Sequence, residues 1–213
     1  MVKNTITYAV SHCCILCALT ICLLGCAGHQ PAPKHPDDIC EIFLGNRQWY
    51  NSANDSFRRW GISIPVMMAI MYQESKFEAD AKPPRTACLF ILPGPRPSSA
   101  YGYSQALDET WKWYKQASGN AGADRDNFGD SIDFIGWYCD QSHIRCGISR
   151  DDAYNLYLAY HQGHGGFRRK AYQHKAWLRR IADTVRHRAG IYGRQLSLCE
   201  SKFKRSRSCL WPF

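Results

Sequence analysis

The sequence predicts a mostly α-helical protein built as a single domain. Apolar residues recur at three- and four-residue steps through most of the chain, which is the spacing of one helix face. No alternating apolar and polar pattern of useful strand length occurs, although residues 89–92 can form a short extended piece. The chain has 213 residues. About 175 of them follow the N-terminal segments described next, which is enough for one core.

The first residues predict an export signal. Lys3 precedes an apolar run over residues 15–24, which is too short to cross a bilayer and is followed by small residues. Two leucines and Gly25-Cys26 close the run, and this ending resembles a bacterial lipobox. The resemblance implies cleavage before Cys26 and lipid attachment to its thiol. An ordinary signal peptide with an incidental cysteine is the alternative.

The expected domain boundaries follow from this signal. Residues 1–25 are predicted as the lipoprotein signal peptide, 26–39 as a lipid-anchored tether rich in proline, 40–200 as the folded domain and 201–213 as a basic C-terminal tail. Ala27, rather than an acidic residue, follows the predicted lipid site. In a Gram-negative cell this residue favours the outer membrane. We therefore expect a cell-envelope protein anchored by lipid on the periplasmic face of that membrane.

The first predicted helices are set by caps and breakers. One helix face covers roughly residues 42–60, with an irregularity at Gly45. A second helix starts after Ser63, has a proline in its first turn and runs to about Ser75. Five prolines between residues 82 and 99 then predict a long loop, because proline removes a backbone donor and breaks a helix.

Further helices are predicted after the proline-rich loop. Gly147 is expected to end one of them, glycines between residues 163 and 166 are expected to break another, and a last one spans about residues 177–191. Their expected N-caps are short polar residues that can accept a hydrogen bond from a free backbone N–H: Asp108, Asp126, and Ser149 in a capping box with Asp152.

Eleven cysteines are divided by the predicted cleavage. An even number stays in the exported domain, which makes disulfides plausible, but six cysteines allow fifteen pairings and the sequence leaves the pairing open. No spacing close to CxxC suggests zinc or redox chemistry, so neither a metal nor a cofactor is expected. The cysteines of the mature domain are Cys40, Cys88, Cys139, Cys146, Cys199 and Cys209.

The net charge is +9, and basic residues concentrate late in the chain, over 168–170, 179–180, 186–188 and 202–207. Such a balance suggests nucleic acid in a cytosolic protein. An exported protein meets anionic wall peptides and lipid head groups instead, and a charge run is usually a solvated helix face. Nucleic acid is therefore not an expected partner.

One glutamate stands at the end of an otherwise apolar helix. Glu74 follows Met68 to Gln73, a segment rich in Met, Ile and Tyr. Burial among such side chains raises the pKa of a carboxyl group, because it disfavours the charged form. A carboxyl protonated near neutral pH can act as general acid on a glycosidic oxygen. A solvent-facing glutamate is the commoner outcome for an isolated residue.

Two later segments give this glutamate a context. Tyr101-Gly102-Tyr103-Ser104-Gln105 places a glycine, aromatic groups and an amide directly after the proline loop. Glycine lets backbone groups approach a ligand closely, and a glutamine can satisfy sugar hydroxyl or acetamido groups. Further on, residues 158–166 end a helix in a glycine-rich turn that carries a tyrosine and two histidines.

Together and in this order, these segments resemble the lytic transglycosylase family, of the soluble lytic transglycosylase type, over roughly residues 60–170. The family pattern is Glu-Ser at a helix end, then Gly-Leu-Met-Gln, then Ala-Tyr-Asn with a glycine following. The resemblance implies a lysozyme-like all-α fold, with Glu74 as catalytic acid and base and Tyr160 beside it. By the same resemblance the substrate-binding residues are Ser75, Tyr101, Gly102, Tyr103, Ser104, Gln105 and His161.

The chain departs from the family pattern in three places. His161 stands where asparagine is usual, Tyr103 and Ser104 replace leucine and methionine, and the proline-rich stretch is longer. These changes indicate a divergent subgroup, because Glu74 and Tyr160 remain.

The resemblance implies cleavage of peptidoglycan glycan strands with one carboxylate. Two alternatives stay open. A hydrolase like the goose-type lysozymes would need a second acidic group, for which Glu78, Asp80 and Asp108 are candidates. A non-catalytic lipoprotein would hold glycan in an inactive cleft within an envelope-spanning machine, with the basic tail as a docking segment.

Overall fold

The computed structural model describes residues 30–85, 87–88, 92–93 and 95–204. The chain divides into two units, residues 1–30 and 31–213, and the account below concerns the second. The predicted export signal and its lipid site at Cys26 lie outside the described residues, as does the end of the basic tail.

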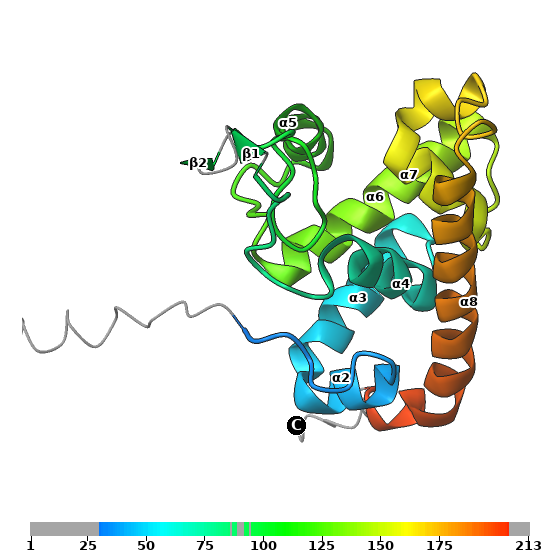
Figure 1. Cartoon of the computed structure of the whole chain (residues 1–213). Helices are drawn as coiled ribbons and strands as arrows, with labels where there is room; N and C mark the ends of the chain where they lie inside the picture. Colours follow the sequence, from blue (N-terminus) through cyan, green and yellow to red (C-terminus); the bar gives the residue numbers. More distant parts are fainter. Residues whose placement is uncertain (1–29, 86, 89–91, 94, 205–213) are drawn as a thin grey trace, which may run out of the picture. The chain divides into compact units, whose positions relative to one another are not determined.

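Helices make up most of the second unit, as the sequence predicts (Figure 1). Two short strands, β1 (Ala87–Cys88) and β2 (Leu92–Pro93), pair antiparallel in the proline-rich loop. The helices are α2 (Ile39–Gly45), α3 (Arg47–Trp60), α4 (Ile64–Ser75), α5 (Asp108–Ser118), α6 (Phe128–Cys146), α7 (Ala153–Arg168), α8 (Ala176–Cys199) and the 3-10 turn η1 (Glu200–Lys202).

Helix α4 is the buried centre of this unit. Its residues from Val66 to Met71 are all buried, because α4 packs against α8, α6 and α3. A helix that is apolar on all sides needs such enclosure. Ile64 begins it, with proline at the next position, and Lys76 ends it in the left-handed conformation, φ 55°. Glu74 therefore lies in the last turn of α4, directly after the buried part of the helix.

Helix α6 crosses α3 and α4 at close range. Gly136 allows this approach, since a Cβ there would lie 2.4 Å from Ser56 Oγ and 3.1 Å from Met67 Sδ. Neighbouring Asp133 accepts hydrogen bonds from Trp60 Nε1 on α3 at 2.7 Å and from the Tyr114 hydroxyl on α5 at 2.8 Å. One carboxylate thus ties three helices together.

Some helices begin at other residues than predicted, because other side chains or positions cap them. The single helix expected over residues 42–60 is two helices, because the Asn46 side chain caps α3 by accepting from the Gln48 and Trp49 amides. The cap of α6 is Asn127 rather than Asp126. Asp108 is the first residue of α5, preceded by Leu107 at the cap position.

Helix α7 also differs from prediction. Asp152 caps it through the Asn155 amide, and no side-chain cap comes from Ser149. The break predicted at the glycines occurs at Gly163 alone, which leaves helical geometry (φ 69°, ψ 158°) and separates two helical segments, the second of which runs to Arg168. Gly147 ends α6 in the left-handed conformation, as predicted.

The two ends of the folded unit are joined. Asp38 caps α2, and a disulfide links Cys40 on α2 to Cys199 at the end of α8. Past the predicted domain end at residue 200, Phe203 is 2% exposed and packs against the rings of Phe43 and Tyr50. The packed unit therefore includes the first residues assigned to the tail.

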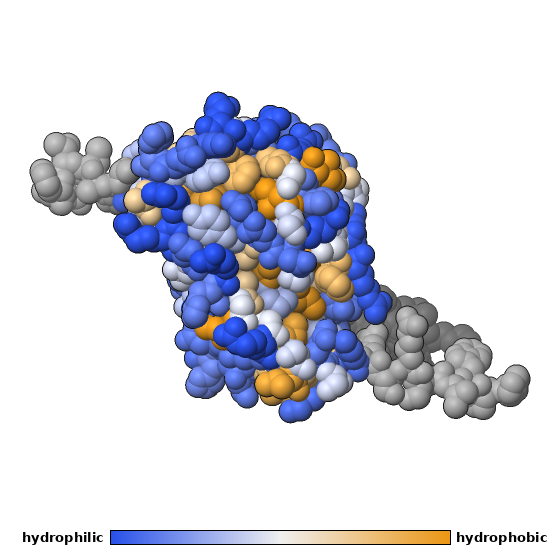
Figure 2. All heavy atoms as spheres, turned by 90° about the vertical axis from the view of Figure 1, so that its right-hand side faces the viewer, coloured by the Kyte–Doolittle hydropathy of each residue, from blue (hydrophilic) through white to orange (hydrophobic). Residues whose placement is uncertain are grey.

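The outer face of α8 is polar and basic. Figure 2 views the molecule from this side and shows a mostly hydrophilic surface with scattered apolar groups. Of the α8 arginines, Arg179, Arg180, Arg186 and Arg194 are exposed. Among the described residues, no helix has the length and apolar character needed to span a membrane.

Candidate active site

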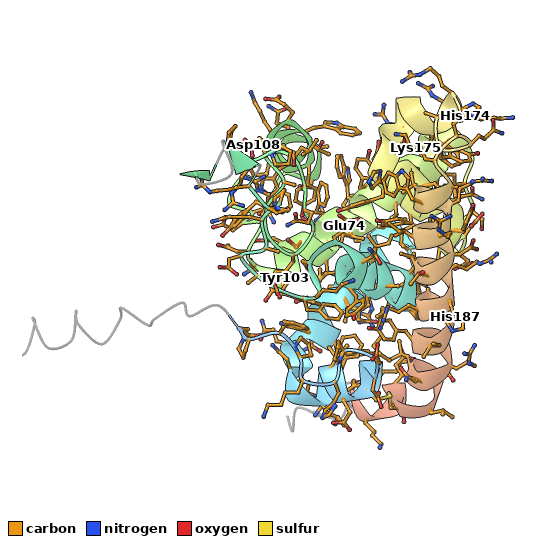
Figure 3. All side chains as sticks on the ribbon, viewed as in Figure 1. Glu74, Tyr103, Asp108, His174, Lys175 and His187 are labelled. Atoms are coloured by element: carbon orange, nitrogen blue, oxygen red, sulfur yellow. A yellow bond between two sulfur atoms is a disulfide. The ribbon has the colours of Figure 1, made fainter. Side chains whose placement is uncertain are left out.

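Glu74 lies in the last turn of α4 (Figure 3), at the point where the buried helix reaches a cleft. The pKa of its carboxyl group is raised to about 7, and burial is the main cause of this shift. A hydrogen bond from the Tyr157 hydroxyl and the nearby Lys76 ammonium act in the opposite direction. The result is a carboxyl group that carries a proton in part of the population at neutral pH.

Tyr157 is the residue that sequence reasoning missed. It is buried, and burial together with the Glu74 carboxylate raises the pKa of its phenol well above the ordinary range. Its hydroxyl therefore stays protonated and donates to Glu74. A buried tyrosine needs a partner for its hydroxyl, and Tyr157 lies one helical turn before Tyr160. Those two signals together could have found it.

The cleft beside Glu74 has a volume of about 520 Å³. Helices α5, α6 and α7 and the end of the proline-rich loop supply its walls. Among the described residues that line it, Glu74 is the one carboxylate. The others are Ser98, Ala100, Gln105, Ala106, Leu107, Thr110, Phe134, Tyr138, Tyr160, His161, Gln162 and Gly163.

The segment 101–106 forms one wall of this cleft through Gln105 and Ala106, whereas Tyr101 and Gly102, predicted to bind substrate, do not line it. Gly102 is left-handed (φ 74°), and a Cβ there would lie 2.1 Å from the Arg125 carbonyl oxygen, so only glycine fits. The Tyr103 amide donates to that same carbonyl at 3.1 Å. The Tyr101 hydroxyl donates to Asp126 Oδ2 at 3.0 Å. The glycine thus serves backbone packing against Arg125.

Three of the predicted substrate-binding side chains are turned into the core. Tyr103 is 1% exposed and packs edge-on against the rings of Trp49 and Phe128. Ser104 is fully buried. Ser75 is also buried, and its hydroxyl donates to the Met71 carbonyl one turn earlier at 3.2 Å. None of these three side chains lines the cleft.

Gln105 does line the cleft, and its side chain is held in place. The amide nitrogen donates to the carbonyl oxygens of Ala81 and Gly102, both at 2.9 Å. Both amide hydrogens are therefore used within the protein. The side-chain oxygen Oε1 is the atom that can accept a hydrogen bond from a ligand.

Tyr160 connects α7 to this wall. Its hydroxyl donates to the Ser104 carbonyl at 2.6 Å, and its ring packs edge-on against Tyr138. Burial is the main cause that raises the pKa of its phenol well above the ordinary range, and the Glu74 charge adds to it. Tyr160 therefore lies near Glu74, while Tyr157 makes the hydrogen bond to the carboxylate.

His161 lines the cleft from the next position of α7. Its Nδ1 lies 2.9 Å from the Gln162 amide nitrogen. Burial, and then the nearby Lys175 ammonium, lower the pKa of its imidazole. This side chain is therefore neutral over more of the physiological pH range than a free imidazole.

The acidic residues considered as a second catalytic group lie elsewhere. Glu78, Asp80 and Asp108 are exposed, and none of them lines the cleft. Asp108 stands at the start of α5 (Figure 3) and forms an ion pair with Arg125 at 2.8 Å. No group of three or more potential metal ligands is found within the described part of the chain.

The site is a cleft in which Glu74, partly protonated at neutral pH, is the one carboxyl group among the described lining residues. A family model described as Transglycosylase SLT domain matches residues 14–199, which is most of the chain. The comparison with curated proteins found no match. The helical fold agrees with the lysozyme-like architecture of that family. Since the matched range includes every element that builds the cleft, the chain belongs to the transglycosylase SLT domain family, whose members act on peptidoglycan.

Proposed function

We propose that the protein is a peptidoglycan lytic transglycosylase in which Glu74 acts first as acid and then as base. Glu74 donates its proton to the oxygen between N-acetylmuramic acid and N-acetylglucosamine as the bond from that oxygen to C1 breaks. The substrate's acetamido group stabilises the positive C1 centre. The ionised Glu74 then takes the proton of the muramic C6 hydroxyl while its oxygen bonds to C1. A 1,6-anhydro end forms and no water is consumed.

The observation that carries this proposal is the single carboxylate among the described residues of the cleft. A hydrolase of the usual kind needs a second carboxylate about 5–9.5 Å from the first, either as nucleophile or to activate water. The candidates for that role are exposed and do not line the cleft. Intramolecular attack by a substrate hydroxyl needs no such partner.

The pKa of about 7 supports the two roles of Glu74. A group whose pKa lies near the working pH can both give and take a proton without a large free-energy penalty. The Tyr157 hydroxyl, which donates to the carboxylate, favours the ionised form needed in the second step.

The location proposed with this function is the cell envelope. The predicted lipid on Cys26 would hold the enzyme at the periplasmic face of the outer membrane, within reach of the wall. Metabolic labelling with a radioactive or alkyne-tagged fatty acid tests this proposal. Label should enter the wild-type chain and be lost in Cys26→Ser, whereas an unlabelled wild-type chain would refute the anchor.

The catalytic proposal is tested with purified peptidoglycan and matched acidic variants. Glu74→Gln should lower the release of soluble fragments by at least about a thousandfold, since it removes the general acid and the base together. Glu78→Gln, four residues further along the chain, past the end of α4 and outside the cleft, should leave the rate within about twofold. Equal losses in both variants would support a two-carboxylate hydrolase instead. A wild-type protein that binds glycan without cleaving it would support the scaffold alternative.

A further inference from the structure

Three side chains beside the cleft form a continuous hydrogen-bonded chain. Lys175, from the turn between α7 and α8 (Figure 3), donates from Nζ to Gln162 Oε1 at 2.9 Å. The amide nitrogen of Gln162 lies 2.9 Å from His161 Nδ1. His161 and Gln162 both line the cleft that holds Glu74.

The chemistry of Lys175 fixes the direction of this chain. An ammonium group has three donors and no acceptor, so the Gln162 atom that faces it must be the oxygen. The amide nitrogen of Gln162, which has only donors, then faces the His161 ring. Nδ1 of His161 must accept that hydrogen bond. The ring proton of the neutral imidazole is therefore on Nε2.

The surroundings of the ring support the same protonation state. Trp177 from α8 packs edge-on against it, with ring centroids 5.3 Å apart, and Tyr157 lies on the preceding turn of α7 at 6.3 Å. Of the described groups that contact the ring or act on its charge, Lys175 is a cation and the two aromatic groups are neutral. A proton on Nδ1 would face the amide hydrogens of Gln162 and the ammonium beyond it.

We propose that Lys175 and Gln162 are positioning residues that hold His161 as the Nε2–H tautomer, which donates a hydrogen bond to an acceptor oxygen of bound glycan. That the ligand is a glycan rests on the proposed function, whereas the assignment of the tautomer is independent of it. The asparagine that the family pattern has at this position also carries side-chain N–H donors. The hydrogen-bonded chain thus makes His161 a hydrogen-bond donor, as the amide of an asparagine would be.

The tautomer is measured by nitrogen-15 NMR of the imidazole in the Glu74→Gln protein, which keeps the cleft but cannot turn over. His161 should show a protonated Nε2 and an unprotonated Nδ1. In Gln162→Glu a carboxylate accepts from both neighbours, so a proton should appear on Nδ1. The inference would be overturned by a proton on Nδ1 of His161 when Gln162 and Lys175 are intact. It would also be overturned if Gln162→Glu left the position of the ring proton unchanged.

Binding of N-acetylglucosamine oligomers to the same protein tests the donor. His161→Ala should weaken binding about five- to tenfold, the worth of one hydrogen bond, and His161→Asn should restore most of it. Lys175→Met should weaken it about two- to threefold, because the ring then samples both tautomers. The exposed residues His174 and Lys112 supply matched controls, His174→Asn and Lys112→Met, which should bind like the parent.

The same titration with deacetylated oligomers identifies the acceptor. If His161→Ala has no effect there, the acceptor is the acetamido carbonyl, and if the loss persists it is a hydroxyl; either result supports the donor role. Unchanged binding of both ligands to His161→Ala would overturn it. A protein without cleavage activity but with the Nε2–H ring would refute the proposed function alone, so the two failures can be told apart.

Discussion

At the scale of single residues, the site depends on the environment of one carboxyl group. Desolvation raises the pKa of Glu74, while Tyr157 lowers it through a hydrogen bond to the charged form, and the balance is a pKa of about 7. In the proposed mechanism, this raised pKa keeps the proton available for the glycosidic oxygen in the first step. The hydrogen bond keeps the group acidic enough to release it.

The Tyr157→Phe substitution tests this balance through the pH profile. Loss of a hydrogen bond to the carboxylate raises the pKa of Glu74, so the fall in kcat/KM on the alkaline side, where the acid is lost, should move to higher pH. The rate at the optimum should fall on the order of tenfold, or about 1.4 kcal/mol. Tyr154→Phe, one turn earlier on α7, is the control and should keep both rate and profile. A Tyr157→Phe profile that moves to lower pH would contradict the assignment.

The sequence predicted a glutamate with a raised pKa at the end of an apolar helix, but not the residue that donates a hydrogen bond to it. An apolar helix that ends in glutamate is visible in residues 68–74, because burial follows from composition. The donor depends on where α7 lies relative to the end of α4, which local pattern does not specify. The same limit applies to Tyr103 and Ser104, whose side chains point into the core although their segment forms the cleft wall.

At the scale of elements, the cleft depends on how α7 is joined to the wall over residues 101–106. Gly102 brings the wall against Arg125, and the Tyr160 hydroxyl links α7 to the Ser104 carbonyl at 2.6 Å. The kink at Gly163 lets α7 continue past the cleft to Arg168. The sequence predicted a break at these glycines. The break lies at Gly163, as predicted, but the sequence did not show that Gly165 and Gly166 are helical again, because glycine adopts both conformations.

Tyr160→Phe should separate a structural hydrogen bond from a catalytic one. The change leaves the buried Ser104 carbonyl without its donor, which costs about 1–2 kcal/mol of unfolding free energy. Urea unfolding measures this loss. Tyr172→Phe, whose ring stacks on Phe167 nearby, should change stability by less than about 0.5 kcal/mol. A Tyr160→Phe protein of unchanged stability would contradict the structural role, as would an alkaline shift of its pH profile equal to that of Tyr157→Phe.

At the scale of the whole folded unit, the ends of the chain hold the helices together. The disulfide between Cys40 and Cys199 joins positions 159 residues apart, and Phe203 closes the same end by packing on Phe43. Six cysteines left the pairing open in the sequence. The pairing follows from α2 lying beside the end of α8, which is a tertiary contact and leaves no local signal.

Removing that disulfide should lower the stability of the unit. Closing so long a loop restricts the unfolded chain, and the chain-entropy relation gives about 5 kcal/mol for it. The double variant Cys40→Ser/Cys199→Ser should therefore unfold at a clearly lower denaturant concentration. Cys146→Ser, a free thiol that is partly buried, is the control and should lose less than about 1 kcal/mol. A double variant as stable as the parent would show that the bridge does not form in the native protein.

The central claim is that the enzyme cleaves the glycan with one catalytic carboxylate and that no water molecule attacks C1. The most direct measurement is mass spectrometry of the muropeptides released from purified peptidoglycan in water enriched in oxygen-18. The account predicts 1,6-anhydro ends that lack one water and carry no oxygen-18, and their disappearance in Glu74→Gln. Reducing ends that carry oxygen-18 would contradict it, because they require water to attack C1 with the help of a second group.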